Sequence, residues 1–300
     1  MDVESGAVHV VDDVTYDVIA LFEDTEISKI VEQLSDKYDK ADIEEAISEV
    51  NQLKEDGQLF TQDIYQPFIE EFKDKRQTVV KALCLHIAHD CNLACKYCFA
   101  EEGEYHGRRA MMSFEVGKKA LDFLVANSGS RVNLEVDFFG GEPLMNWDVV
   151  KQLVEYGRSL EEPNHKKFRF TLTTNGVLLN DEIMEYLNKE MSNVVLSLDG
   201  RKEVNDRMRP FRTGKGSYDL IVPKFQKLAE SRNQEKYYIR GTFTRNNLDF
   251  SNDILHFADL GFKQMSIEPV VGDESDPYAI REEDIPQTVS YTHLTLPTNS

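Results

Sequence analysis

The sequence predicts an α/β fold with a parallel sheet, preceded by a small N-terminal α+β domain. Beyond residue 80, apolar β-branched runs alternate with amphipathic helical patterns, an order typical of βαβ units. With 300 residues, 41% of them hydrophobic, the chain can bury one substantial core and a small satellite domain. Polar and turn-forming motifs follow the predicted strands, which is where parallel sheets place their functional sites.

Residues 1–75 are predicted to form the satellite domain, with a winged-helix-like fold. Its strands and helices carry β-branched runs and helical apolar spacing, respectively. The predicted elements are strands at Gly6–Val11 and Val14–Phe22 (the second with helical character), helices at 26–37 and 42–55, and a short segment at Gln58–Phe60. Because this domain is acidic, peptide or protein binding is favoured over the DNA binding for which winged helices are often used.

Residues 76–285 are predicted to form the larger domain, after a connecting stretch at 62–80. Six strands are expected at Ala82–Ala88, Asn133–Phe139, Phe168–Thr174, Val194–Leu198, Tyr237–Phe243 and Gln264–Val270. Five helices are expected between them at Ser113–Val125, Trp147–Leu160, Asp181–Lys189, Tyr218–Ala229 and Phe250–Ala258. This strict alternation predicts that the strands are parallel.

Residues 286–300 are predicted to be a non-native tail. No Lys, Arg, Asp or Glu follows Asp284 in the last sixteen residues, although 29% of the chain is charged. The string from Val289 to Thr298 resembles a translated sequencing adapter, and a polar terminal strand or a disordered tail is the alternative. The adapter interpretation implies that the natural C-terminal domain is missing.

Composition excludes several functional classes. No apolar run approaches the roughly 20 residues that cross a bilayer. The acidic start, Met1–Glu4, lacks the positive region of a secretory signal, so we expect a cytoplasmic protein in a reducing compartment. A net charge of -20 disfavours nucleic acid and anionic membrane surfaces as partners.

Three of the four cysteines, Cys91, Cys95 and Cys98, lie within eight residues at the end of the first predicted strand. Clustered thiols in a reducing compartment indicate metal ligands, and three leave one coordination position open. Iron–sulfur ligation is favoured, because structural zinc sites commonly show a second ligand pair that this chain lacks. Zinc stays an alternative, with Cys84, His86 or His89 as fourth ligand, although Cys84 is expected to pack as a small apolar residue.

Polar motifs end the next three predicted strands. Gly140–Pro143 follows the second strand, Thr173–Gly176 the third and Ser197–Gly200 the fourth. Each of them also fits a turn without further function. Arg240 stands among apolar residues of the fifth strand, and a buried arginine requires an anionic partner.

The spacing Cys-x3-Cys-x2-Cys, with the aromatic Tyr97 before the last cysteine, resembles the signature of radical S-adenosylmethionine (SAM) enzymes. The resemblance implies a [4Fe–4S] cluster on the three thiolates, with the amino and carboxylate groups of SAM on the fourth iron. It also implies a partial (β/α)6 TIM-like barrel and a one-electron donor of the flavodoxin or ferredoxin type. Zinc-stabilised peptide binding is the non-enzyme alternative.

The resemblance extends to the strand-end motifs and assigns cofactor contacts but no catalytic residue. The Gly-Gly-Glu-Pro motif is similar to the one that binds the amino group of SAM, through its backbone and Glu142. Ser197 and Asp199 are similar to contacts of the ribose and methionine moieties, and Arg240 is a candidate partner of the methionine carboxylate. The cofactor-binding residues implied are Gly140, Gly141, Glu142, Pro143, Asn175, Ser197, Asp199 and Arg240.

More narrowly, the chain resembles radical SAM maturases of six-cysteine SCIFF peptides. This implies that the N-terminal domain recruits a cysteine-rich precursor peptide and that the barrel forms bonds from cysteine sulfur to an α-carbon. Those maturases carry a C-terminal domain with auxiliary clusters, whereas this chain has no cysteine after Cys98. A sulfatase-maturing enzyme or another peptide maturase of the same superfamily is the alternative.

Overall fold

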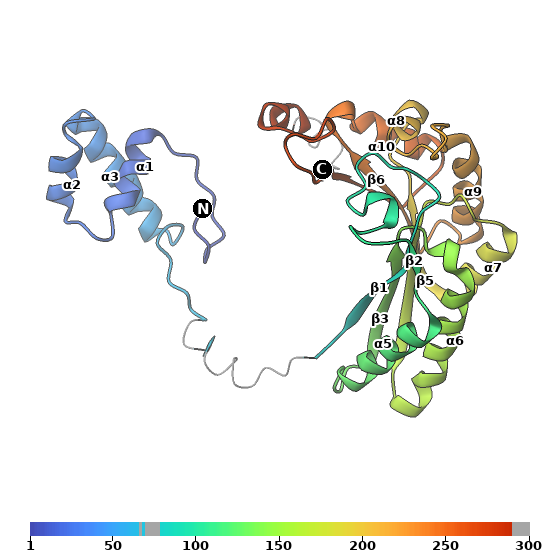
Figure 1. Ribbon diagram of the computed structural model, residues 1–300. Coiled ribbons are helices and arrows are strands. Elements are labelled where there is room, and N and C mark those ends of the chain that lie inside the picture. Colours follow the sequence, from blue (N-terminus) through green and yellow to red (C-terminus); the bar gives the residue numbers. More distant parts are fainter. Residues whose placement is uncertain (66–67, 70–78, 290–300) are drawn as a thin grey trace. The chain divides into compact units, whose positions relative to one another are not determined.

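The computed structural model describes residues 1–65, 68–69 and 79–289. The chain divides into two compact units, Met1–Thr78 and Val79–Ser300, which are distinguished in Figure 1. Most of the predicted connecting stretch and residues 290–300 of the predicted tail lie outside the described residues. Residues 285–289 of the larger unit are helical.

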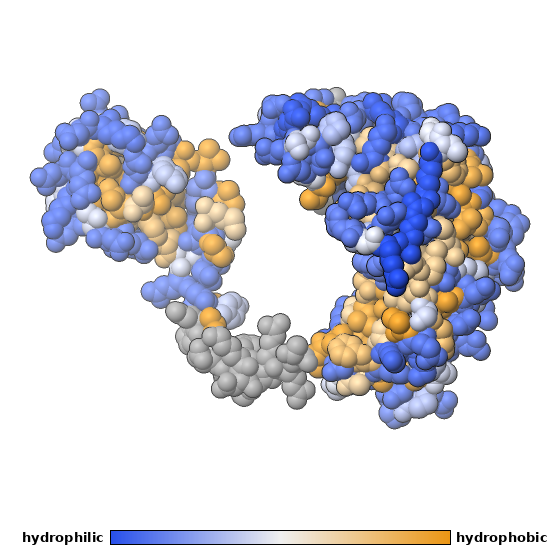
Figure 2. All heavy atoms as spheres, viewed as in Figure 1, coloured by the Kyte–Doolittle hydropathy of each residue, from blue (hydrophilic) through white to orange (hydrophobic). Residues whose placement is uncertain are grey.

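The described part of the N-terminal unit includes the helices α1 (Asp13–Leu21), α2 (Ile27–Leu34) and α3 (Lys40–Glu55). They pack around their own apolar core, whose fully buried members are Val18, Ile30, Ile43 and Val50. Figure 2 shows apolar side chains gathered at the centre of the viewed face of this unit, with hydrophilic residues around them. A small helical core of this kind can hold the unit together without a sheet.

The predicted N-terminal strands are wrong in the described residues. Most of Val14–Phe22 lies in α1, because Asp12 caps the helix by accepting a hydrogen bond from the Thr15 backbone N–H and Val18 is buried in the core. Packing thus overrides the β-propensity of this segment. The unit is helical rather than α+β, and the winged-helix-like expectation is corrected accordingly.

The larger unit is built on one seven-stranded sheet, and its α/β class is the predicted one (Figure 1). Its strands are β1 (Ala82–His89), β2 (Ala110–Met111), β3 (Asn133–Gly140), β4 (Lys167–Thr174), β5 (Met191–Ser197), β6 (Tyr237–Phe243) and β7 (Met265–Pro269). The spatial order is β2-β1-β3-β4-β5-β6-β7, and every pairing is parallel except that of β2 with β1. All six predicted strands are therefore present in a parallel arrangement, and the two-residue β2 is an addition.

Helices connect successive strands and lie along one side of the sheet (Figure 1). They are α5 (Phe114–Ala126), α6 (Trp147–Asn164), α7 (Asp181–Glu190), α8 (Lys202–Met208), α9 (Tyr218–Ser231) and α10 (Ser251–Asp259). The five predicted helices are confirmed, and α8 was not predicted. The result is the open, partial barrel of alternating strands and helices that the motif resemblance implies.

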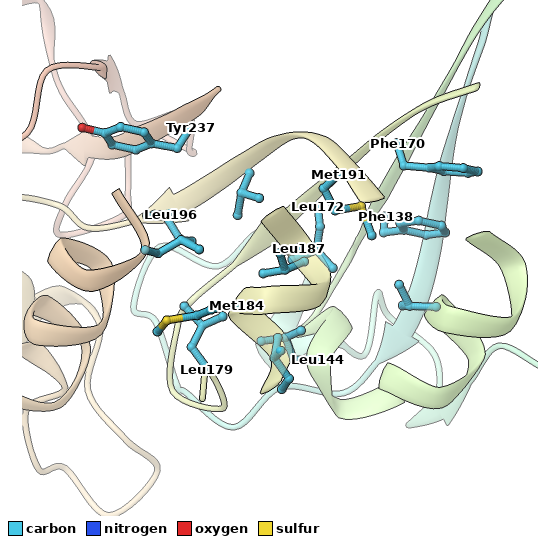
Figure 3. Packing of buried hydrophobic residues seen from close by; sticks show 14 of the residues in the cluster. Phe138, Leu144, Phe170, Leu172, Leu179, Met184, Leu187, Met191, Leu196 and Tyr237 are labelled. Carbon is cyan, nitrogen blue, oxygen red and sulfur yellow. The ribbon is translucent and has the colours of Figure 1, made fainter. Parts of the chain in front are cut away.

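The main apolar core lies between the sheet and its helices. Leu121 of α5 and Leu153 of α6 belong to the same buried cluster as Phe138 and Phe170 of the sheet. Figure 3 shows the last two rings side by side, with centroids 5.6 Å apart and planes 10° apart. Strand residues that alternate with these core residues face away from the helices, on what we call the inner face of the sheet.

Cys84 lies on the inner face and is exposed, so its predicted apolar packing is wrong. Its neighbours Leu85 and Ile87 are the residues of β1 that enter the core. Period-two alternation along the strand is the physical reason for the difference. Among the described residues, no helix combines the length and apolar character needed to cross a membrane.

Candidate functional site

The loop that carries the three cysteines is held at the end of β1 by backbone hydrogen bonds. Gly141 donates to the carbonyl of Ala88 at 2.7 Å, and Glu142 donates to that of Asp90 at 2.9 Å. On its other side the loop donates two backbone bonds to residues 208–210, at 2.8 and 2.9 Å. The cysteine loop is thereby fixed between the end of β3 and the segment that follows α8.

Cys91, Cys95 and Cys98 line one cavity of about 440 Å³ at the carboxyl ends of the strands. The remaining walls come from the ends of β3, β4, β5, β6 and β7 and from the segments that follow them. The lining residues beyond the cysteines include Tyr97, Phe99, Gly140, Gly141, Thr174, Asn175, Ser197, Arg209, Arg240, Thr242 and Glu268. The cavity lies where parallel α/β sheets place their sites.

Burial makes these thiols weak acids in the protein without metal. It raises the pKa of Cys91 to about 11 and that of Cys95 to about 12. The nearby Arg209 guanidinium acts in the opposite direction on both pKa values. Thiolate is the metal-binding form, so metal binding here has to displace protons.

A buried polar cluster of Tyr97, Asp199 and Arg209 lies against the cysteines. The Tyr97 hydroxyl donates to both carboxylate oxygens of Asp199 at 2.8 Å and accepts from Arg209 Nη1 at 2.7 Å. Arg209 Nη1 is 3.9 Å from Asp199 Oδ1, and the Thr242 backbone N–H donates to the same oxygen at 3.2 Å. The cluster joins the cysteine loop to the ends of β5 and β6.

The donor groups around the thiols fit an anionic iron–sulfur cluster. Asn92 Nδ2 and Arg209 Nε are buried and have no hydrogen-bond partner among the described residues. Asn175 Nδ2 reaches Cys91 Sγ at 3.5 Å. Three thiolates bound to iron together with inorganic sulfide would supply the negative charge and the acceptors that these donors lack.

The Glu142 carboxylate is fully buried and joins two strand-end loops. It accepts hydrogen bonds from the Leu144 N–H at 3.0 Å, the Thr174 hydroxyl at 2.7 Å and the Asn175 N–H at 2.8 Å. Burial raises the pKa of Glu142, and these three donors oppose the rise. In this structure Glu142 acts on the cavity by positioning the Gly-Gly backbone and Asn175.

The structure brings five of the predicted cofactor contacts to the cavity wall, and the other three are not among its lining residues. The wall residues are Gly140, Gly141, Asn175, Ser197 and Arg240. The other three, Glu142, Pro143 and Asp199, are all buried.

Arg240 is not the buried cation that its apolar neighbours predict. Its side chain is half exposed and pairs with Glu268 of β7. It lies on the inner face of β6, where the alternating residues Ile239 and Gly241 face the other way and are buried. The anionic partner that the sequence requires for Arg240 is thus present within the chain.

The sequence does not decide whether Arg209 forms a structural pair with Asp206 or borders the substrate. Asp206 instead accepts from the Tyr218 N–H at 2.8 Å and pairs with Lys202 at 3.1 Å. Helical periodicity could have indicated that Arg209 is buried, because the buried face of α8 carries Val204 and Met208 and continues to Arg209.

The two histidines proposed as alternative zinc ligands belong to an aromatic group. The rings of His86 and His89 lie 4.7 and 4.8 Å from the ring of Tyr105. Among the described residues, no three His, Cys, Asp or Glu side chains are arranged to hold a single metal ion.

Comparison with known proteins identifies a family for the barrel. The family model described as the Radical SAM superfamily matches residues 85–241, which include the three cysteines and the motifs at the ends of β3, β4 and β5. This match spans more than half of the chain.

Three similar proteins illustrate the relationship. The radical SAM cyclopropyl synthase TigE of Paramaledivibacter caminithermalis is 27% identical over 60% of this chain and 39% of its own length. A cysteine-type anaerobic sulfatase-maturating enzyme of Clostridium novyi is 28% identical over 65% of this chain and 54% of its own. A solved structure, native anSMEcpe with bound AdoMet and Cp18Cys peptide, shares the fold with a TM-score of 0.63 and 22% identity, covering 72% of this chain and 59% of that one. The chain thus matches about half the length of these relatives.

Proposed function

The chain belongs to the radical SAM superfamily. We propose that it is an enzyme that uses a [4Fe–4S] cluster and SAM, and that Cys91, Cys95 and Cys98 bind the cluster. The single observation that carries this assignment is that all three thiols line one cavity with the Gly140–Gly141 backbone. When bound and reduced, the cluster supplies an electron that cleaves SAM to methionine and a 5′-deoxyadenosyl radical.

The residues of this chain position the cofactors and exclude water from them. Gly140 and Gly141 bring backbone groups to the cavity, and no side chain intervenes there. Asn175 and Ser197 add polar side chains on the neighbouring strands, while the Tyr97–Asp199–Arg209 cluster keeps a positive charge beside the thiols. These groups are the proposed holders of SAM, in agreement with its ammonium, carboxylate and hydroxyl groups.

We propose a ribosomally made, cysteine-rich peptide as the substrate and the formation of bonds from cysteine sulfur to α-carbon as the reaction. Support comes from the motif resemblance and from relatives that include a sulfatase-maturating enzyme and a structure with a bound peptide. Phe99 and Val271 line the cavity and are both exposed, so they can give an extended peptide apolar contacts. A flavodoxin- or ferredoxin-like protein in the cytoplasm is the proposed electron donor.

The N-terminal unit is the proposed recruiter of the precursor peptide. Its described residues form no strand, so docking by strand addition finds no sheet edge there. Val8 and Val10 are 72% and 100% exposed and offer apolar contacts instead. A sulfatase-maturing activity is the second candidate, favoured by the Clostridium novyi relative.

Anaerobic reconstitution with iron and sulfide tests the cluster assignment. We expect the visible thiolate-to-iron absorption and bound iron in the natural chain and in Cys84→Ala, and neither in the triple replacement of Cys91, Cys95 and Cys98 by Ala. Undiminished iron in the triple variant would overturn the assignment. Incubation with a six-cysteine precursor peptide then tests the substrate: each thioether removes two hydrogen atoms from the peptide mass, whereas sulfatase-type oxidation changes a single cysteine.

A further inference from the structure

The inner face of the sheet carries a row of polar side chains outside the cysteine cavity. Strand register places Cys84 of β1 beside Asp137 of β3, Asp137 beside Thr171 of β4, and Thr171 beside Asn193 of β5. All four residues line a hollow of about 630 Å³ on this face. The row contains a carboxylate, an amide, a hydroxyl and a thiol from residues that line one space.

Two oxygen atoms in this row lack hydrogen-bond donors. Asp137 Oδ1 and Asn193 Oδ1 are buried and have no partner among the described residues. Burial of an unpaired acceptor costs about 1–3 kcal/mol. Both orphaned atoms are acceptors, so a ligand that satisfies them has to donate.

Asp137 also lacks a compensating charge. The other carboxylate of the hollow, Glu135, is paired with Lys81 at 3.3 Å and Arg169 at 3.5 Å, whereas Asp137 forms no ion pair with any described residue. Arg240, the cation that acts electrostatically on Asp137, is already paired with Glu268. Burial raises the pKa of Asp137, which shows that its charged form is poorly solvated.

We infer that Asp137 and Asn193 form a subsite for a cationic group with several N–H donors, an alkylammonium or a guanidinium. A carboxylate and an amide oxygen on the two sides of Thr171 match the donors of such a group, and Thr171 adds a hydroxyl between them. A neutral apolar group would leave both oxygens unsatisfied and the charge of Asp137 unpaired.

The occupant that we assign is a Lys or Arg side chain of the peptide substrate, and this assignment rests on the proposed function. Asp137 precedes Phe139 by two residues on β3, and Phe139 lines the cysteine cavity. Two residues of a strand span about 7 Å, which a lysine side chain bridges. The subsite therefore selects peptides with a basic residue next to, or one residue away from, the residue that is modified.

Cys84 is a built-in reporter for this subsite. It lies beside Asp137 in the row, and it stays free when the other three cysteines of the chain bind the cluster. Partial desolvation on the sheet face and the charge of Asp137 both raise the pKa of Cys84. A cation bound at Asp137 will therefore change the rate at which Cys84 is alkylated.

The test follows the alkylation of Cys84 by iodoacetamide in the reconstituted full chain, with N-acetyl-lysinamide as the probe and peptide mass spectrometry as the readout. We expect a saturable rate increase of roughly threefold, because a cation beside the thiol favours its thiolate form. The uncharged analogue N-acetyl-norleucinamide should have no effect. A probe that has no effect, or an equal effect of both compounds, overturns the subsite.

Variants locate the effect within the hollow. Asp137→Asn should speed alkylation without the probe and abolish the response to it. Glu135→Gln is the matched control, because it removes a paired carboxylate from the same strand and hollow and should keep the response. Asn193→Val should weaken the response and leave the rate without probe unchanged. Lys236 also lines the hollow. If Lys236→Met by itself slows the alkylation of Cys84 without the probe, Lys236 already pairs with Asp137 and the inference is wrong.

This readout needs neither SAM cleavage nor a peptide substrate, so its failure is distinguishable from failure of the proposed function. Mass spectrometry reports Cys84 separately, whether or not the other cysteines hold a cluster. With an active enzyme, replacing the basic residue near the modified position by norleucine should raise KM about tenfold at unchanged kcat, the effect of losing about 1.4 kcal/mol of binding.

Discussion

Arg209 is a buried guanidinium on which both the cysteine loop and the buried Asp199 depend. Its Nη1 holds the Tyr97 hydroxyl, and its charge opposes the rise that burial imposes on the pKa of Cys95. Asp199 is fully buried, and its pKa is raised by burial and lowered by Arg209. The Arg209 guanidinium thus offsets the charge of the Asp199 carboxylate and favours the thiolate form of Cys95.

Replacing Arg209 by Leu should therefore destabilise the chain by about 3–5 kcal/mol, the usual cost of leaving a buried charge without its partner. Urea denaturation of the metal-free protein measures this loss, and iron content after reconstitution should fall as well. Arg207→Leu is the matched control, because Arg207 lies two residues earlier on the exposed side of α8. Equal stabilities of the two variants would show that Arg209 does not compensate Asp199.

At the scale of elements, the end of β3 approaches the end of β1 so closely that a side chain has no room. A Cβ atom at Gly141 would overlap with the carbonyl oxygen of Asp90, which directly precedes the first cysteine. The contact is with backbone, so it cannot be relieved by a rotamer change. Absence of a side chain at this position is a requirement of the cysteine loop.

Gly141→Ala should displace the loop and cost roughly 2–4 kcal/mol of stability, in the range of severe steric substitutions. SAM affinity of the reconstituted protein should fall together with thermal stability. Gly107→Ala serves as control, because its Cβ would meet nothing nearer than the Glu104 carbonyl oxygen at 3.4 Å. Wild-type stability in Gly141→Ala would contradict the close approach.

In the N-terminal unit, Asp2 ties the first residues to the segment after α3. Its carboxylate accepts from the Ser5 N–H at 2.9 Å and from the backbone and hydroxyl of Thr61. These bonds hold the pKa of Asp2 well below its usual range, the Thr61 hydroxyl contributing most. The ionised carboxylate therefore stabilises the contacts of Asp2 with Ser5 and Thr61 in the folded unit.

The tie should persist above the ordinary Asp pKa of about 3.9 and weaken as pH falls through the lower folded value. Amide hydrogen exchange of residues 2–12 in the full chain, followed from neutral to acid pH, measures it. Asp2→Asn should show fast exchange of this segment already at neutral pH, with Asp36→Asn, on an exposed turn, as control. Protection that is unchanged in Asp2→Asn would rule out the tie.

Sequence patterns predicted the elements of the barrel well, because each strand and helix has enough residues for a clear period. Patterns predicted less well where a tertiary contact decides. Val14–Phe22 has β-propensity but is a helix, since Asp12 caps it and Val18 enters a helical core. Cys84 was assigned to the core because its apolar surroundings do not say which face of the sheet is covered by helices.

The candidate site likewise combines local features, which the sequence predicts, with contacts between distant residues, which it does not. The cysteine spacing marks the site directly, since all three residues lie in one loop. The partner of Asp199 could not be read from the sequence, because Tyr97 lies 102 residues away along the chain. Glu142 was recognised as part of a motif, but its bonds to Thr174 and Asn175 depend on two loops meeting in space.

At the scale of the whole molecule, the chain consists of two units with separate apolar cores. The described residues that line the cysteine cavity belong to the larger unit. The proposed role of the N-terminal unit is peptide binding.

A chain that lacks residues 1–78 should thus keep its rate of reductive SAM cleavage. Its affinity for the precursor peptide should fall about tenfold or more, equivalent to at least 1.4 kcal/mol. Formation of 5′-deoxyadenosine measures the first quantity, and fluorescence anisotropy of a labelled precursor measures the second. Unchanged peptide affinity would remove the N-terminal unit from substrate recruitment.

The apolar contacts that stabilise the barrel lie on the helix-covered side of the sheet, between residues such as Phe138 and Leu153. Substitutions on the inner face therefore change the lining of the hollow with little effect on folding. The two faces can then diverge at different rates, one constrained by packing and the other open to selection for new substrates. A scaffold of this kind can acquire a new specificity through single substitutions without first acquiring extra stability.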